Sequence, residues 1–543
     1  MKTNQPSWTK WVLGSWVLVV AVLGGLTLFG DDLRVLFGHS ADALGGEESL
    51  EARTFARSGA DTKKTLKSFG EAFGSDGYGP ALAPARVEPT QAPNPTVSTY
   101  EDALSTFAID VDTASYTYAR RQLEAGFHVE RSTVRVEEWV NAFRYQLEAP
   151  KDAPWAIHVE GAPSPFTPRR VLLKVALQGR RFSNSERKPA NLVLLVDTSG
   201  SMSGEDRLEL AKKSMHLLVD GLDGRDTVAI ATYAGGSALV LPATSAAEKA
   251  MIHRSISSLR SGGGTAMESG MVLAYREAVK GVREGVSSRV LVFTDGDANI
   301  GATGPADMLA AVERYVRDGV TLTTVGYGLG NTRSNALEQL ADKGNGQSLY
   351  IDREAELERV FSQSNLPGLL QVISKDVKVQ VAFEPSVVRH YRLLGYENRE
   401  VRDEDFRNDA VDGGELHAGH TVTALYELEL TGVEGTLGQV AVRGLSPANG
   451  KAFEVARAIG PGALVSNVNA ASADFRFATA VAMAADVLRG NPAAGVTLRE
   501  AKALAETAAA DWPERREFIA LLGRALEGEG SGARAANAWR YRY

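Results

Sequence analysis

Oxygen-bearing side chains gather in three short loops of this sequence, each beside a predicted strand or helix. The loop at 197–203 reads Asp-Thr-Ser-Gly-Ser-Met-Ser, so alternate positions offer a carboxylate and two hydroxyls, and its glycine lets the turn tighten. The loop at 261–265 brings a threonine hydroxyl just before a predicted helix, and the loop at 293–297 ends a predicted strand with a carboxylate. Hard oxygen ligands from separate loops suit Mg²⁺, which prefers about six oxygens in an octahedron.

The elements around these loops predict a doubly wound α/β sheet. Residues 191–196 form a continuous apolar run, which is typical of a strand buried on both faces of a parallel sheet. Similar runs recur between helical stretches at 227–232, 290–294, 322–325 and 348–351. Ligands of such sheets bind at the carboxyl ends of the strands, so we expect the three loops to meet there.

The loops resemble the metal-ion-dependent adhesion site (MIDAS) of the von Willebrand factor A (vWA) domain. That site uses an Asp-x-Ser-x-Ser loop, a threonine from a second loop and an aspartate from a third. By this resemblance the metal-site residues are Asp197, Ser199, Ser201, Thr265 and Asp295. The resemblance implies that the three hydroxyls bind Mg²⁺ or Mn²⁺ directly, that one or both carboxylates act through water, and that a protein partner supplies an Asp or Glu carboxylate to the metal.

The flanks of the vWA region resemble the bacterial YfbK-like group of vWA proteins. The segments that carry this likeness are 105–116 and 134–138 before the vWA region, and 391–399 and 419–427 after it. The resemblance extends from about residue 99 to 526. Members of the group are often anchored by a lipid on a cysteine, whereas this chain has no cysteine.

Composition narrows the classes of function. A length of 543 residues corresponds to about three or four compact units, and a content of 44% apolar and 23% charged residues is typical of a folded protein. The net charge of -8 gives no general attraction to nucleic acid, so we expect no nucleic-acid partner. The lack of cysteine excludes disulfides, thiolate zinc sites and cysteine nucleophiles.

Residues 11–30 carry no charged side chain and predict one transmembrane helix, since 20 residues at about 1.5 Å each reach about 30 Å. Lys2 and Lys10 precede this run and two aspartates follow it, which places the N-terminus in the cytoplasm and the bulk in the periplasm or exterior. The alternative is a cleaved signal peptide with a site at 41–43. We favour the anchor because the run exceeds the roughly 7–15 residues of a signal core.

We expect the α/β unit to be inserted in, or flanked by, a β-sandwich. Residues 156–160 and 171–177 read as strands before it, and alternating apolar residues from 376 onward read as strands after it. Neither group alone makes a sheet with a covered face, so we expect them to pair. The expected parts are a cytoplasmic stub and anchor (1–30), a disordered linker (31–98), an N-terminal vWA-associated region (99–188), the vWA domain (189–366), a β-rich region (367–458) and a helical C-terminal region (459–543).

Helical patterns flank the sheets at both ends. Asp112 is a candidate cap for a helix that buries Tyr116, Ala119 and Leu123, and a second helix is expected over 136–147. Near the C-terminus, 475–489 and 498–526 are alanine-rich and helical by pattern.

Two further groups are candidate metal ligands. Asp110 and Asp112 either bind a second cation or cap the helix that follows them, and an acidic pair in this place is typical of a cap. His417 and His420 are spaced for a metal, but they flank a glycine in a turn and lack a third partner, so we expect no zinc there.

The function that these residues favour is divalent-cation-dependent protein binding, as an adhesion or scaffold protein and without catalysis. The rival is a Mg²⁺-dependent hydrolase acting on phosphate esters, since a metal at strand ends can polarise a phosphoryl oxygen. No histidine or lysine falls in the three loops, so the rival lacks a general base. A third possibility is a scaffold in which the site only stiffens the loops.

Overall fold

The computed structural model describes residues 92–296, 312, 314–328 and 334–540, and two short strands, β1 (Glu51–Ala52) and β2 (Lys64–Thr65). The chain forms two units, Met1–Arg86 and Val87–Tyr543, and β1 pairs with β2 within the first. The predicted anchor at 11–30 lies outside the described residues. Within the described ranges, we find no helix both long enough and apolar enough to cross a bilayer. The six-part division proposed from the sequence stays a prediction.

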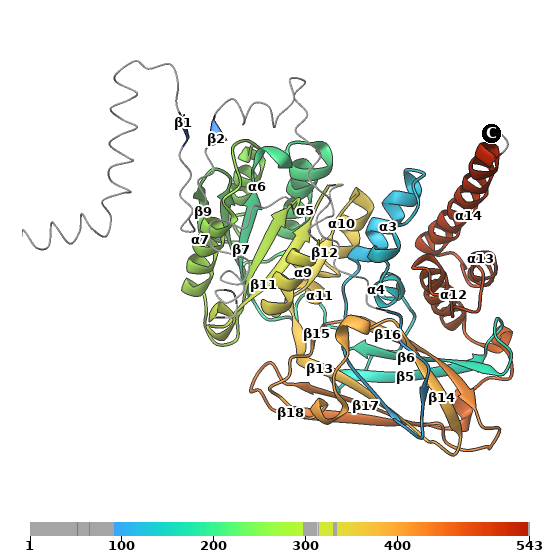
Figure 1. Ribbon diagram of the computed structural model, residues 1–543. Helices are drawn as coiled ribbons and strands as arrows, with labels where there is room; N and C mark the ends of the chain where they lie inside the picture. Colours follow the sequence, from blue (N-terminus) through green and yellow to red (C-terminus); the bar gives the residue numbers. More distant parts are fainter. Residues whose placement is uncertain are drawn as a thin grey trace, which may run out of the picture. The chain divides into compact units, whose positions relative to one another are not determined.

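The second unit contains a six-stranded sheet of order β12-β11-β10-β7-β8-β9 (Figure 1). Its parallel strands are β7 (Ala190–Asp197), β8 (Thr227–Tyr233), β10 (Ser287–Thr294), β11 (Val320–Gly326) and β12 (Ser348–Tyr350). All five were expected from the sequence. The edge strand β9 (Ser237–Ser245) runs antiparallel to β8 and was missed, because most of its side chains are exposed and it contains Pro242.

Helices cover both faces of this sheet, as a doubly wound arrangement requires. Leu192, Leu194 and Val196 of β7 pack in one cluster with helices α5 (Leu210–Gly221), α6 (Lys249–Ser258), α10 (Glu354–Phe361) and α11 (Leu366–Leu370). Val193 and Leu195 pack on the other face with α7 (Met267–Lys280) and α9 (Ser334–Lys343). Successive side chains of a strand point to opposite faces, so burial on both explains the continuous apolar run of β7.

Two antiparallel sheets form from the chain on either side of this α/β domain. One contains β4 (Leu104–Ala108), β13 (Val372–Phe383), β15 (Gly414–His417), β17 (Gly438–Leu445) and β18 (Ala452–Ile459). The other has the order β3 (Val97–Ser98), β14 (Val388–Leu394), β16 (Thr421–Leu430), β6 (Arg170–Gly179) and β5 (Trp155–Pro163). Side chains from both sheets share one hydrophobic cluster that includes Phe107, Leu173, Val381 and Tyr426.

The expected pairing of strands from before and after the α/β domain is present. β6 and β16 pair from Arg170–Glu429 to Gln178–Thr421. The α/β domain, from β7 to α11, is therefore inserted between β6 and β13 in the chain.

Five helices form a separate apolar cluster. They are α3 (Ala114–Glu124), α4 (Val136–Asn141), α12 (Ala473–Leu488), α13 (Leu498–Glu506) and α14 (Pro513–Arg540). Two predicted ranges were too long. α4 ends at Asn141, and the stretch predicted as one helix over 498–526 breaks before Pro513, which lacks an N–H group and suits the first turn of a new helix.

Candidate metal site

The structure brings the three predicted loops together at the carboxyl end of the α/β sheet. β7 and β10 are neighbours, so Asp197 at the end of one strand lies beside Thr294 at the end of the other, and the Thr294 hydroxyl donates a 2.9 Å hydrogen bond to Asp197 Oδ2. Two backbone bonds join the first loop to the second, from Gly200 N to the carbonyl of Gly263 at 3.1 Å and from Gly262 N to the carbonyl of Thr198 at 2.7 Å.

Asp197 holds the first loop in a tight turn. Its Oδ1 atom accepts a 2.9 Å hydrogen bond from the backbone N–H of Ser199. The hydroxyl oxygens of Ser199 and Ser201 then lie 2.9 Å apart. Asp197 and Ser199 are buried, whereas Ser201 is partly exposed, so one side of the hydroxyl pair is accessible.

The second loop depends on glycine at the point where it meets the first. Gly263 has φ +90, a conformation that side chains of L residues rarely adopt. This backbone carries the chain to Thr265, which is partly buried two residues before α7 begins.

The electrostatics of the site include an arginine that sequence reasoning missed. Arg207 Nη1 lies 3.5 Å from Asp295 Oδ2, and the same group donates a hydrogen bond to the carbonyl oxygen of Ser201. Burial, together with the Asp295 carboxylate, raises the pKa of Asp197 against the hydrogen bonds from Ser199 and Thr294. The Arg207 guanidinium beside the buried Asp295 carboxylate offsets part of the negative charge of the site. The sequence pointed to this contact only in that Arg207 follows the first loop by a few residues.

The arrangement fits a small hard cation. Adjacent oxygen ligands of an octahedral Mg²⁺, each at about 2.1 Å from the ion, lie about 3 Å apart, close to the 2.9 Å between the Ser199 and Ser201 hydroxyl oxygens. In the part of the chain that the structure describes, no three His, Cys, Asp or Glu side chains are grouped to hold a metal ion. The predicted set does not need such a group, because it combines three hydroxyls with two carboxylates.

Asp110 and Asp112 were expected either to bind a second cation or to cap the following helix, and the structure pairs them with an arginine instead. Arg399 lies 3.2 Å from Asp110 and 3.7 Å from Asp112, so a guanidinium takes the place of a second cation. The predicted cap is wrong as well, because Thr113 is the N-cap residue of α3 and Asp112 instead accepts a hydrogen bond from the backbone N–H of Ser348 at 3.2 Å.

His417 and His420 lie together without a third ligand in the described structure. Their ring centroids are 5.3 Å apart, and His417 Nε2 is 3.4 Å from Arg289 Nη2. Burial and this guanidinium lower the pKa of His417, so a positive charge is already disfavoured there.

The fold and the three loops define a protein with a vWA domain, and comparison with known proteins agrees. The model of the von Willebrand factor type A domain matches residues 191–363, a model described as von Willebrand factor matches 89–174, and one described as uncharacterized protein YfbK, C-terminal, matches 368–444. The uncharacterized protein YfbK of Escherichia coli is 37% identical over 460 residues, covering 79% of each chain. The chain therefore belongs to the YfbK-like family of vWA proteins.

Two more comparisons cover parts of the chain. The magnesium-chelatase 60 kDa subunit of Rhodobacter capsulatus is 32% identical over 168 residues, which is 30% of this chain and 29% of that protein. A solved structure titled von Willebrand factor type A from Catenulispora acidiphila is 17% identical and covers 73% of this chain and 89% of its own, with a TM-score of 0.41.

Proposed function

We propose that this chain is a membrane-anchored adhesion or scaffold protein that binds a protein partner through Mg²⁺ or Mn²⁺. Ser199, Ser201 and Thr265 would hold the ion directly, with one or both of the Asp197 and Asp295 carboxylates acting through water. The anchor would be the helix at 11–30, with the vWA domain carried by a β-sandwich in the periplasm or exterior. vWA domains typically mediate protein interactions, and the chain contains one over residues 191–363.

The observation that carries the proposal is the pair of hydroxyls on a turn fixed by Asp197. When bound, the cation supplies a positive centre that attracts a carboxylate from an Asp or Glu of the partner. The chain's own residues prepare this centre. The bond from Ser199 N to Asp197 keeps the hydroxyls side by side, and the contact of Arg207 with Asp295 reduces the negative charge that would repel an acidic partner.

A Mg²⁺-dependent hydrolase of phosphate esters is the second candidate, since a metal ion at the strand ends can polarise a phosphoryl oxygen. Hydrolysis needs a group that takes a proton from water. Besides the two carboxylates assigned to the metal, Arg207 contacts these loops, and it stays protonated at neutral pH and is a poor base. Binding therefore accounts for this set of residues better than hydrolysis does.

Calorimetric titration of the full-length protein with Mg²⁺ tests the metal site. Removing the buried Asp197 carboxylate in Asp197→Ala should abolish binding, and Ser199→Ala should weaken it by about 10- to 150-fold, since one contact to a charged group is worth about 1.5–3 kcal/mol. The matched control is Ser203→Ala, an exposed serine of the same loop. Equal heats for wild type and Asp197→Ala would reject the site, and phosphate-ester turnover lost in Ser199→Ala would favour the hydrolase.

A further inference from the structure

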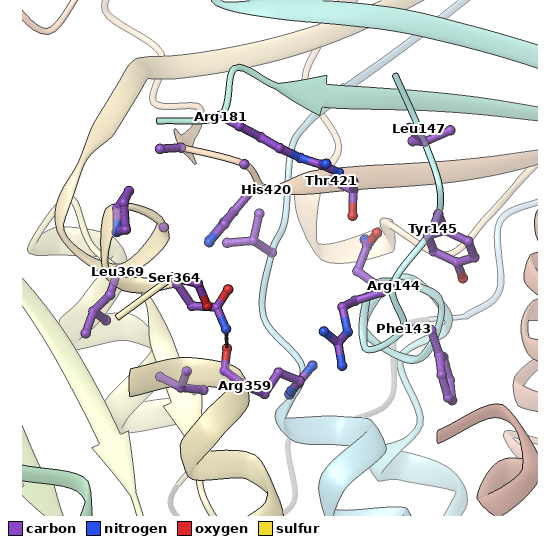
Figure 2. Close-up of a pocket in the computed structure, with 18 of the residues that line it drawn as sticks. Phe143, Arg144, Tyr145, Leu147, Arg181, Arg359, Ser364, Leu369, His420 and Thr421 are labelled. Carbon is purple, nitrogen blue, oxygen red and sulfur yellow. Dashed lines mark hydrogen bonds between the residues drawn. The ribbon is translucent and has the colours of Figure 1, made fainter. Parts of the chain in front are cut away.

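A cavity of about 770 Å³ lies in the second unit, away from the loops of the metal site. It is bordered by the segment after α4, by the end of α10 with the start of α11, and by the turn before β16 (Figure 2). Its size falls within the roughly 300–1,000 Å³ of typical ligand pockets. Neither the metal-site prediction nor the family assignment gives it a role.

The lining of this cavity is strongly cationic. Arg144, Arg181 and Arg359 line it, and Glu148 is the single acidic residue among its lining side chains in the described structure. Figure 2 shows the guanidinium groups of Arg144 and Arg359 pointing toward each other across the cavity, while Arg181 extends along the opposite wall. Like charges that face one another favour an anion between them.

The three arginines differ in how firmly the protein holds them. Arg359 is fixed, since its Nε donates to Glu356 at 2.7 Å and its Nη1 donates to the carbonyl of Ala142 at 3.0 Å. Arg144 is largely exposed and lies 3.6 Å from Glu514, a distance at which solvent weakens the pairing. For Arg181, which is exposed, the described chain offers neither a hydrogen bond nor an ion pair to its guanidinium.

His420 lines the cavity as a neutral ring. Burial, aided by the charges of Arg289 and Arg359, lowers its pKa to about 4, so the ring is neutral at physiological pH. It therefore presents one N–H donor and one acceptor to a ligand. Ser364 and Thr421 add hydroxyl groups on neighbouring walls, as Figure 2 shows.

We propose that this arginine-lined cavity binds an acidic peptide segment of a protein partner. Guanidinium groups recognise carboxylates by paired hydrogen bonds, and the exposed Arg181 and the weakly paired Arg144 can each take an acidic side chain, while Arg359 stays paired with Glu356. The cavity is larger than one carboxylate or phosphate needs, and its neutral polar groups suit peptide amides. This site goes beyond the proposed metal site, because it uses arginines in place of a divalent ion.

Fluorescence anisotropy tests this binding with a labelled peptide of six alternating Asp and Glu residues, titrated with full-length protein in EDTA. The chelator removes the contribution of any metal site, so a failure here leaves the metal proposal untouched. We expect saturable binding that weakens with added salt, and no binding of the matched Asn/Gln peptide. Arg181→Ala should weaken binding about fivefold or more, and the double variant Arg144→Glu, Arg181→Glu should abolish it.

The control is Arg254→Ala, which removes the same charge from an exposed position on α6 and should bind the peptide as wild type does. Thermal melting checks that each variant stays folded. The proposal is overturned if the wild-type protein does not bind the peptide in EDTA, or if the double variant binds it as tightly as wild type. It is also overturned if pyrophosphate binds at the arginines and the peptide does not, which would make the ligand a small anion.

Discussion

Replacing Asp226 with alanine should sharply destabilise the vWA domain without touching its metal loops. Asp226 forms a two-pronged pair with Arg187, at 2.8 Å and 2.6 Å, and both side chains are completely buried. The same carboxylate accepts hydrogen bonds from the backbone N–H groups of Ala190 and Asp223, at 2.8 Å and 2.9 Å. These residues lie at the amino ends of β7 and β8, opposite the proposed metal site.

The expected loss of stability follows from the groups that Asp226→Ala leaves buried without a partner. Breaking a buried ion pair by removing one partner costs about 3–5 kcal/mol, because the remaining charge is uncompensated. Two backbone N–H groups also lose their acceptor, so we expect a loss of at least about 4 kcal/mol in the free energy of unfolding. For a domain of this size that corresponds to a melting point lower by about 8–16 °C.

Scanning calorimetry of the full-length protein measures this shift. The matched control is Asp223→Ala, since Asp223 is 40% exposed, pairs with Arg225 at 2.9 Å and should contribute about 0–1 kcal/mol. A melting point for Asp226→Ala within 2 °C of that control would refute the reasoning. Because the metal loops lie at the other end of the strands, Mg²⁺ binding by the folded fraction should be unchanged.

Two further predictions concern pH and the anchor. Burial raises the pKa of Glu137 to about 7 and raises those of Glu138 and Glu338, so the folded state holds protons that the unfolded state has lost. The free energy of unfolding should therefore fall as pH rises from about 4.5 to 7. Melting points that do not change over this pH range would contradict the prediction. So would a pH dependence of the melting point that is the same in Glu137→Gln as in wild type. If residues 11–30 span the bilayer, the protein should stay in membranes after carbonate washing and be digested by external protease, whereas a soluble mature form beginning near Leu44 would reject the anchor.

The sequence predicted those helices and strands whose buried faces produce a recognisable pattern of apolar residues. The five parallel strands were found because β7 and its neighbours are apolar on both faces, and the pairing of β6 with β16 followed from the need to cover both groups of strands. β9 was missed because an exposed edge strand needs no apolar pattern. The length of α4 was overestimated because Phe143 is buried at helical spacing although the helix has already ended.

The candidate site was predictable where its residues match a pattern shared by the three loops, at 197–201, Thr265 and Asp295. The turn at 197–201 carries its own hydroxyl pair, and the agreement of this turn with the two other loops and with the vWA resemblance pointed to the site. The contact of Arg207 with Asp295, and that of Arg399 with the acidic pair at 110 and 112, join segments far apart in the chain. No local pattern predicts such contacts, and the same holds for the arginines that line the cavity.

The place of β4 in its sheet has a mechanical consequence. β4 and β13 are antiparallel, with Leu104 opposite Ala382 and Ala108 opposite Lys378. β13 follows directly from the vWA domain, so a pull that reaches β4 from its N-terminal end and β13 from the vWA side draws the two strands from their opposite ends. The interstrand hydrogen bonds lie across this direction, so they share the load in shear instead of opening one after another. The ladder between β4 and β13 therefore resists such a pull along its whole length.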